Sequence, residues 1–239
     1  MKPQLSLQGA VRCRSRGNHT FELRVPDFTL APGDFVAVAG ASGCGKSTLL
    51  DLLALVLPPD STRHFSFHLG DSSVDLQNLW NTGDEAALAA IRRRHLGYVL
   101  QTGGLFPFLS VRHNIRLALD LNGAADDGRV DALAETIGLS APMLASKPQF
   151  LSGGQRQRAA ILRALAHRPR VVLADEPTAA VDQELAHRIV RELRRLAAVE
   201  GSTVIMVTHD RTLVDENDVQ YGFDLHAEEN RTVSTCKRH

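Results

Sequence analysis

The sequence has no excess of either charge, since its 27 lysines and arginines are balanced by 27 aspartates and glutamates. No overall charge draws the chain to nucleic acid or to an anionic membrane surface, and we expect no nucleic-acid partner. Cysteine is scarce as well: Cys13, Cys44 and Cys236 are odd in number and follow no spacing pattern. This usage predicts reduced thiols in a cytosolic compartment.

Long apolar runs are also missing. No stretch approaches the roughly 20 apolar residues that cross a bilayer, and the first residues have no apolar core of the signal-peptide type. If a membrane is involved, we expect the chain to dock on a partner that lies in it. Repeats, low-complexity tracts and flexible linkers are absent too. A length of 239 residues suffices for one large α/β domain or two small ones.

A glycine-rich stretch, Gly40–Ser47, carries the clearest chemical signal. It follows the apolar run Phe35–Ala39 and leads into Thr48–Leu55, which predicts a buried strand, a turn and a helix that begins at Lys46. This order and the pattern G-x-x-x-x-G-K-[ST] are typical of a P-loop, where backbone N–H groups and a helix N-terminus bind phosphate. A glycine turn that merely precedes a helix is the alternative, and the flanking strand and helix disfavour it. The predicted nucleotide-binding residues are Gly40, Ala41, Ser42, Gly43, Cys44, Gly45, Lys46, Ser47 and Thr48.

Two of these residues have a predicted role of their own. Lys46 is expected to reach the β- and γ-phosphates, and the Ser47 hydroxyl is expected to bind Mg²⁺.

The rest of the chain alternates strand and helix patterns. Strands are predicted for 5–12, 20–30, 64–69, 97–100, 171–174 and 203–207, with a closing hairpin over 219–236 around Glu229-Asn230. Helices are predicted from Lys46 to Pro58, and over 84–95, 155–167 and 182–199. The segment 105–150 shows only short helices, one capped by Ser110 and another capped by Asp126 or Asp127 and closed by Gly138.

These patterns predict an α/β fold with a P-loop NTPase core and a mostly parallel sheet. An antiparallel β subdomain at the N-terminus and an inserted α-helical subdomain complete it. We expect a single domain over 1–239, with the β part and the core at roughly 1–100 and 160–239 and the helical subdomain at roughly 101–160.

Acidic residues follow a second apolar strand, Val171–Ala174. Because ligands bind at the carboxyl ends of parallel strands, Asp175 is predicted to lie in the Mg²⁺ shell and Glu176 beside the attacking water. Two acids that start a solvated loop are the alternative. Gln101 and His209 also follow strands. Gln101 could orient water or Mg²⁺, and His209 could contact a γ-phosphate. Taken alone, each is more simply explained as a loop cap or a surface residue.

Leu151–Gln155, with the sequence Leu-Ser-Gly-Gly-Gln, predicts a second anion site. Ser152 and Gln155 form a capping box, which by itself only starts a helix. The two glycines between them leave bare amides at the positive end of that helix. Because one chain has one P-loop, a second phosphate-binding helix end implies the nucleotide of a partner.

Together these features resemble the ATP-binding cassette of ABC transporters, and the resemblance covers nearly the whole chain. Its motifs correspond to Gly40–Thr48 (Walker A), Gln101 (Q-loop), Leu151–Gln155 (signature), Val171–Asp175 (Walker B), Glu176 (catalytic glutamate), Ala180–Asp182 (D-loop) and His209 (switch histidine). The resemblance implies an ATPase that binds ATP and Mg²⁺, with Ser47, Gln101 and Asp175 near the metal. It further implies catalysis by Glu176, His209, Lys46 and Gln101, and nucleotide contacts from Leu151, Ser152, Gly153, Gly154, Gln155 and Asp182.

The resemblance also implies partners. Two copies of the cassette are expected to sandwich ATP head to tail and to drive an integral-membrane permease, which places the chain in the cytoplasm on the inner face of the cell membrane. The segment Arg92–Asn114 is similar to the lipoprotein-release and macrolide-efflux group, whose permease is FtsX-like. An ordinary importer is the alternative. A soluble ATPase of DNA repair would carry long coiled coils, and a translation-type protein two cassettes; neither feature is found. Leu105–Leu109 with Val111 is expected to receive a permease helix.

Two positions depart from the family or stay open. The family stacks adenine on an aromatic residue of the first hairpin, but Val11–Thr20 contains none, so Arg14 or His19 is a candidate substitute. Cys44 lies inside the phosphate loop. Its place at a helix N-terminus could lower the pKa of its thiol, whereas burial under nucleotide could leave it inert.

Overall fold

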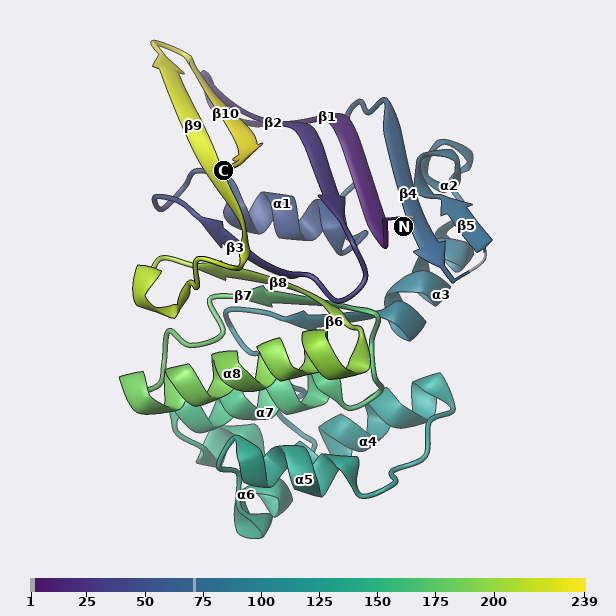
Figure 1. Cartoon of the computed structure of the whole chain (residues 1–239), viewed down its shortest axis with the longest axis vertical. Helices are drawn as coiled ribbons and strands as arrows, with labels where there is room; N and C mark the ends of the chain where they lie inside the picture. Colours follow the sequence, from purple (N-terminus) through teal and green to yellow (C-terminus); the bar gives the residue numbers. More distant parts are fainter. Residues whose placement is uncertain (1–2, 71) are drawn as a thin grey trace.

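The architecture centres on one continuous sheet, described here from a computed structural model that covers residues 3–70 and 72–239. Within those residues the sheet has ten strands in the order β5-β4-β1-β2-β10-β9-β3-β8-β7-β6 (Figure 1). The strands are β1 (Leu5–Arg16), β2 (His19–Leu30), β3 (Phe35–Ala39), β4 (His64–Leu69), β5 (Ser72–Asp75), β6 (Leu96–Val99), β7 (Val171–Asp175), β8 (Thr203–Thr208), β9 (Val219–Glu228) and β10 (Arg231–Arg238).

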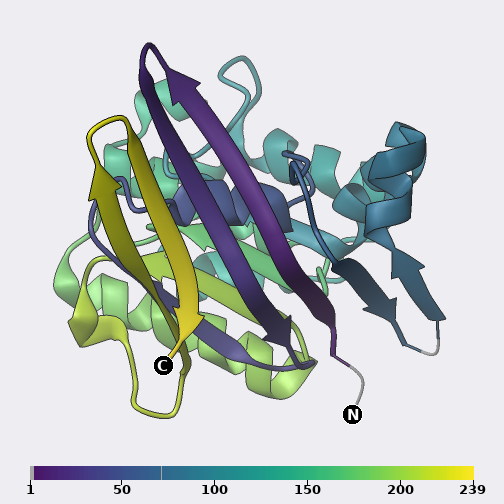
Figure 2. The same cartoon turned by 90° about the horizontal axis from the view of Figure 1, so that it is seen from above.

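The sheet joins an antiparallel part to a parallel part. β1 and β2 form the predicted hairpin, in register from Leu5↔Leu30 to Arg16↔His19. β3, β8, β7 and β6 run parallel, as expected for strands linked by helices. The C-terminal hairpin connects the two parts, because β10 pairs parallel with β2 while β9 pairs parallel with β3 (Figure 2).

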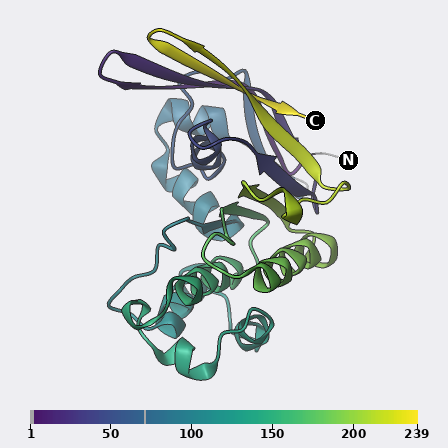
Figure 3. The same cartoon turned by 90° about the vertical axis from the view of Figure 1, so that its left-hand side faces the viewer.

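Helices cover both faces of the parallel strands (Figures 1 and 3). They are α1 (Lys46–Leu53), α2 (Leu76–Thr82), α3 (Glu85–His95), α4 (Val111–Asn122), α5 (Arg129–Thr136), α6 (Ala141–Ala145), α7 (Gly153–Leu165) and α8 (Gln183–Glu200), with 3-10 turns at Pro148–Phe150 and Arg211–Leu213. Along β7, Val171 and Leu173 face the core that contains α1, whereas Val172 and Ala174 face the core that contains α7 and α8. Burial on both faces explains why the strand is apolar at every position before its two acids.

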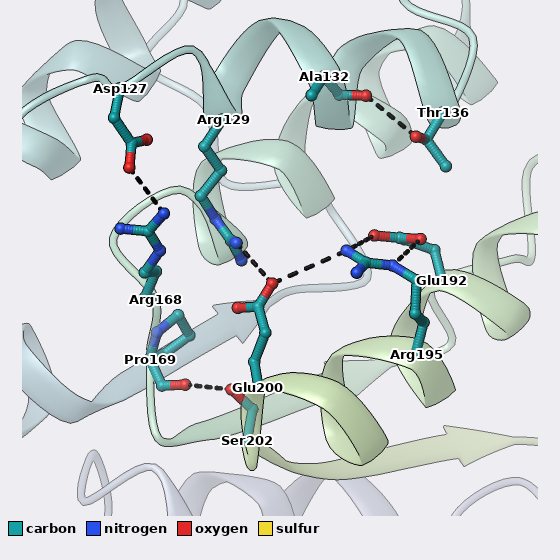
Figure 4. Close-up of polar contacts among 10 residues, drawn as sticks. All are labelled: Asp127, Arg129, Ala132, Thr136, Arg168, Pro169, Glu192, Arg195, Glu200 and Ser202. Atoms are coloured by element: carbon teal, nitrogen blue, oxygen red, sulfur yellow. Dashed lines mark hydrogen bonds and ion pairs between the residues drawn. The ribbon is translucent and has the colours of Figure 1, made fainter.

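Between β6 and β7 the chain forms only helices and turns, from α4 to α7. Figure 3 shows this helical segment at one end of the molecule, with the antiparallel strands at the other. Ion pairs tie it to α8 and to the α7–β7 connection: Arg129 lies 2.6 Å from Glu200, and Arg168 lies 2.7 Å from Asp127 (Figure 4). The subdomain boundaries near residues 101 and 160 stay a prediction.

Several expected boundaries were wrong. The helix that begins at Lys46 ends at Leu53, well before Pro58, because Leu55 adopts a left-handed φ of 58° that no helix can continue. β5 and α2 were not expected; Asp75 starts that helix by accepting a hydrogen bond from Asn78 N.

The cap expected for the second inserted helix was also wrong. Helix α5 begins after Gly128, which is left-handed at φ 86°, and no side chain caps it. Asp126 instead accepts a hydrogen bond from Gly128 N at 3.2 Å, which forms the turn before the helix.

Candidate functional site

The glycine-rich loop connects β3 to α1, as the sequence predicts. Gly43 and Gly45 are left-handed, with φ of 79° and 104°, a conformation that costs glycine nothing. No side chain caps the helix N-terminus and no acid lies in its first turn. Lys46 Nζ donates to the carbonyls of Gly40 and Ala41, each at 2.9 Å, and thus lies against the loop. Free amides, a positive helix end and a lysine fit the binding of phosphate.

A cavity of about 350 Å³ opens over this loop. It is lined by Arg14, Phe21, Ser42, Gly43, Gly45, Lys46, Ser47, Thr48, Gln101, Asp175 and Glu176. The structure therefore gathers residues from four predicted motifs around one cavity.

Phe21, an aromatic residue of the first hairpin, lines this cavity and directly follows Val11–Thr20, which contains no aromatic residue. It lies in β2 directly opposite Arg14 of β1, so the hairpin register could have revealed it. Its ring carbon Cζ is 3.1 Å from the position a β-carbon on Gly45 would occupy, so only glycine fits there without a shift. His19 hydrogen-bonds Thr232 at 3.1 Å and is not among the residues that line the cavity.

Ser47 and Asp175 both line the cavity and carry side-chain oxygen atoms. Asp175 is only 7% exposed, and burial raises the pKa of its carboxyl. A hydrogen bond from Ser47 lowers that pKa, whereas the nearby charges of Glu176 and Asp51 raise it further. A hydroxyl and a carboxylate next to a phosphate loop are the donors that Mg²⁺ prefers, so these residues fit the metal.

Gln101, Glu176 and His209 come together beside the same cavity, although they lie far apart in the sequence. Gln101 Nε2 is 3.4 Å from one carboxylate oxygen of Glu176, and His209 Nδ1 is 3.3 Å from the other. Glu176 adopts a φ of 47°, which is unfavourable for a residue with a β-carbon. Its N–H donates to the carbonyl of Val207 at 3.1 Å, which holds this conformation against β8.

The signature stretch forms the predicted capping box at the start of α7. Ser152 Oγ accepts from Gln155 N at 3.3 Å, and Gln155 Oε1 accepts from Ser152 N at 2.8 Å. A β-carbon on Gly154 would lie 2.6 Å from the carbonyl oxygen of Ala180, so this glycine allows the D-loop backbone to approach. Asp182 caps α8 through Leu185 N at 2.9 Å. Residues 151–155 are not among those that line the cavity over the P-loop of their own chain.

Cys44 is buried under the C-terminal hairpin. Burial raises the pKa of its thiol, and the positive charge of Lys46 only partly opposes this effect. Burial by the protein itself thus opposes the lowered pKa that the helix N-terminus would give, whereas burial under nucleotide stays a prediction.

Comparison with known proteins identifies the family. Residues 23–179 match the family model described as ABC transporter. The chain belongs to the ABC transporter family. The lipoprotein-releasing system ATP-binding protein LolD of Novosphingobium aromaticivorans is 36% identical over 215 residues, which cover 88% of this chain and 92% of LolD. Membership in this ATP-binding family implies ATPase activity, generally with Mg²⁺.

Other relatives are longer. The macrolide export ATP-binding/permease protein MacB of Syntrophobacter fumaroxidans is 40% identical over 193 residues, or 79% of this chain, but the chain spans only 26% of that protein. A solved structure of the ATP-binding cassette MJ0796, a dimer in a post-hydrolysis state bound to ADP and Pi, matches with a TM-score of 0.79 at 30% identity. The match covers 90% of this chain and 93% of that one. None of the helices in the described part of this ABC protein is both long and apolar enough to cross a membrane.

Proposed function

We propose that this chain is the ATP-hydrolysing subunit of a transporter in which two copies close head to tail on two ATP molecules. One observation carries the proposal. Gln101 and Glu176 line the phosphate-loop cavity and His209 contacts Glu176, whereas residues 151–155 of the same chain are not among those that line it. A second copy would complete each site by presenting its own Ser152–Gln155 to the nucleotide held by the first.

Each residue then has a distinct task. The loop amides and Lys46 bind the phosphates, and Glu176 accepts a proton from the attacking water. His209 is 68% exposed on its side chain and touches Glu176, so it can hold that carboxylate and contact the γ-phosphate when the dimer closes. Ser47 and Asp175 would hold Mg²⁺, whose charge would offset that of the phosphates. Phe21 and Arg14, opposite each other on the hairpin, are placed to contact the base.

The coupling partner is a separate membrane permease that docks on the loop Leu105–Leu109. Phe106 and Phe108 are exposed there with ring centroids 5.7 Å apart. Buried Asn114 holds the loop: its Oδ1 accepts from Phe106 N at 2.7 Å, and its Nδ2 donates to three carbonyls of the loop and its end. An ordered apolar patch of this kind suits an apolar helix of a partner.

The relatives named for lipoprotein release and macrolide export favour an FtsX-like permease, and the chain would then work at the inner face of the cell membrane. An importer with a channel-type permease is the alternative. Purification of the tagged chain from detergent-solubilised membranes separates the two: an FtsX-like partner supports the proposal, and a channel with a separate binding protein supports the importer.

Glu176→Gln tests the catalytic role. The amide cannot take a proton, so we expect phosphate release to fall by at least about 100-fold while ATP binding is kept. ATP should then hold the variant as a dimer on a sizing column. Glu135→Gln, an exposed change on α5, is the matched control and should release phosphate like the wild type. Phosphate release by Glu176→Gln at the control's rate would contradict the role.

A further inference from the structure

The last strand of the sheet touches the phosphate loop. β10 lies between β2 and β9, with Ser234 opposite Leu23 on one side and Leu225 on the other (Figure 2). Ser234 is completely buried, and its hydroxyl donates to the carbonyl oxygen of Cys44 at 2.5 Å. The strand lies outside residues 23–179, the part of the chain that matches the family model.

This bond completes a pattern around the loop. The carbonyls of Gly40 and Ala41 accept hydrogen bonds from Lys46, and that of Ala41 also accepts from Cys44 N at 3.3 Å. The Cys44 carbonyl instead accepts its hydrogen bond from Ser234, which reaches it from the sheet. Three carbonyls of the loop are thus each held by a hydrogen bond.

The hydrogen bond from Ser234 to the Cys44 carbonyl also fixes the direction of the next N–H group, because the peptide unit is planar. In a trans peptide unit the C=O and the next N–H point in opposite directions. Holding the Cys44 carbonyl toward β10 therefore directs the N–H of Gly45 away from the sheet, and Gly45 lines the phosphate cavity. Glycine resists a peptide rotation less than any other residue, so an external restraint matters most at this position.

We propose that Ser234 is a positioning residue for nucleotide binding: its buried hydroxyl fixes the 44–45 peptide so that the Gly45 amide faces the phosphates. The inference rests on the proposed function, since it assumes that this cavity binds the phosphates of ATP. It adds a residue from the far end of the chain to a site otherwise built from motifs.

Ser234→Ala tests this inference in the full-length chain. Loss of one hydrogen bond should weaken the binding of both ATP and ADP about fivefold in calorimetry, since the amide serves phosphates that both nucleotides carry. The KM for ATP should rise by a similar factor while kcat stays within about twofold, because the interaction is equally strong in ground and transition states.

Ser202→Ala is the matched control. Ser202 is also buried and donates its hydroxyl to a backbone carbonyl, that of Pro169, at 2.8 Å, away from the loop (Figure 4). Ser202→Ala should lose about as much thermal stability as Ser234→Ala but keep the wild-type affinity for ATP and ADP. Ser234→Thr, which retains the hydroxyl, should restore binding.

The outcomes separate cleanly. The positioning role would be overturned if Ser234→Ala bound nucleotide with wild-type affinity, or if Ser202→Ala lost as much affinity as Ser234→Ala. It would also be overturned if Ser234→Thr melted like the wild type but still bound nucleotide more weakly. A wild-type chain that binds neither nucleotide would instead contradict the proposed function. Weakening confined to Ser234→Ala supports the inference.

Discussion

Asp175 shows how the site trades stability for chemistry at the scale of a single residue. Its carboxyl is buried beside Glu176 and Asp51, so the folded chain disfavours the charged form. A positive metal ion would reverse this balance, because it favours the carboxylate. Asp175 thus lowers the stability of the free protein, whereas in the complex with metal and nucleotide its carboxylate would be favoured.

Asp175→Asn should therefore stabilise the nucleotide-free chain at neutral pH by about 2–4 °C in melting temperature. The folded pKa lies above the ordinary value of 3.8. Below 3.8 the carboxyl is neutral in both the folded and the unfolded chain, so the wild type carries no penalty. As pH rises through the folded pKa, the wild type loses stability and the variant does not. Melting curves of both proteins from acidic to neutral pH check this prediction. A gain in the melting temperature of the variant that is largest at acidic pH would contradict it.

Sequence patterns located the residues whose chemistry depends on neighbours along the chain. Lys46 and Ser47 follow from the loop pattern, and Glu176 follows from its position after a buried strand. Phe21 lies one position beyond Val11–Thr20, and Asn114 contacts residues only four to eight positions away, so neither of these depends on a distant contact. Ser234 was missed because its contact is with a distant segment. The Ser234 hydroxyl meets the carbonyl of Cys44 across 190 positions of the chain, and no local pattern records such a pairing.

At the scale of elements, the loop before α4 should behave as a docking surface rather than as part of the core. Phe108→Asp removes an exposed side chain, so we expect unchanged melting and ATPase activity of the isolated chain. The amount of tagged variant recovered in the membrane pellet of its own cells should fall by about tenfold, because the new charge would be buried against the partner. Val199→Asp is the control, because Val199 on α8 is 70% exposed, close to the 67% of Phe108.

Equal membrane recovery of Phe108→Asp and Val199→Asp would move the docking site elsewhere. Loss of both from the pellet would mean that any added charge disrupts assembly, and the loop would have no special role.

Element types were predicted better than element ends. β7 and β8 were expected because strands buried on both faces are apolar throughout. The end of α1 was not, because Leu55 turns left-handed only where the tertiary structure holds it. β5 and α2 escaped notice because Ser72–Asp75 has no apolar alternation, and α2 buries only Leu76.

At the scale of the whole molecule, strands from both ends of the sequence contact the phosphate loop: β2 through Phe21 and β10 through Ser234. The closing hairpin was predicted, but its partners were not, because a parallel pairing of β10 with β2 leaves no trace in either strand alone. The same limit applies between molecules. The capping box at Ser152 explains the start of α7 completely, so only an experiment on two copies distinguishes a helix cap from half of a nucleotide site.

Ser152→Asp makes that distinction, in the Glu176→Gln background with ATP. Aspartate caps a helix as well as serine does and favours the positive helix end, so the fold should be kept or strengthened. In a head-to-tail dimer, however, its charge would face the γ-phosphate held by the partner, and we expect dimerisation to weaken at least about tenfold. Ser152→Asn has nearly the same shape without the charge and should dimerise. Sedimentation of both variants measures the difference. Equal dimerisation of the two would mean that this helix end meets no phosphate, and that its glycines serve only the approach of the Ala180 backbone.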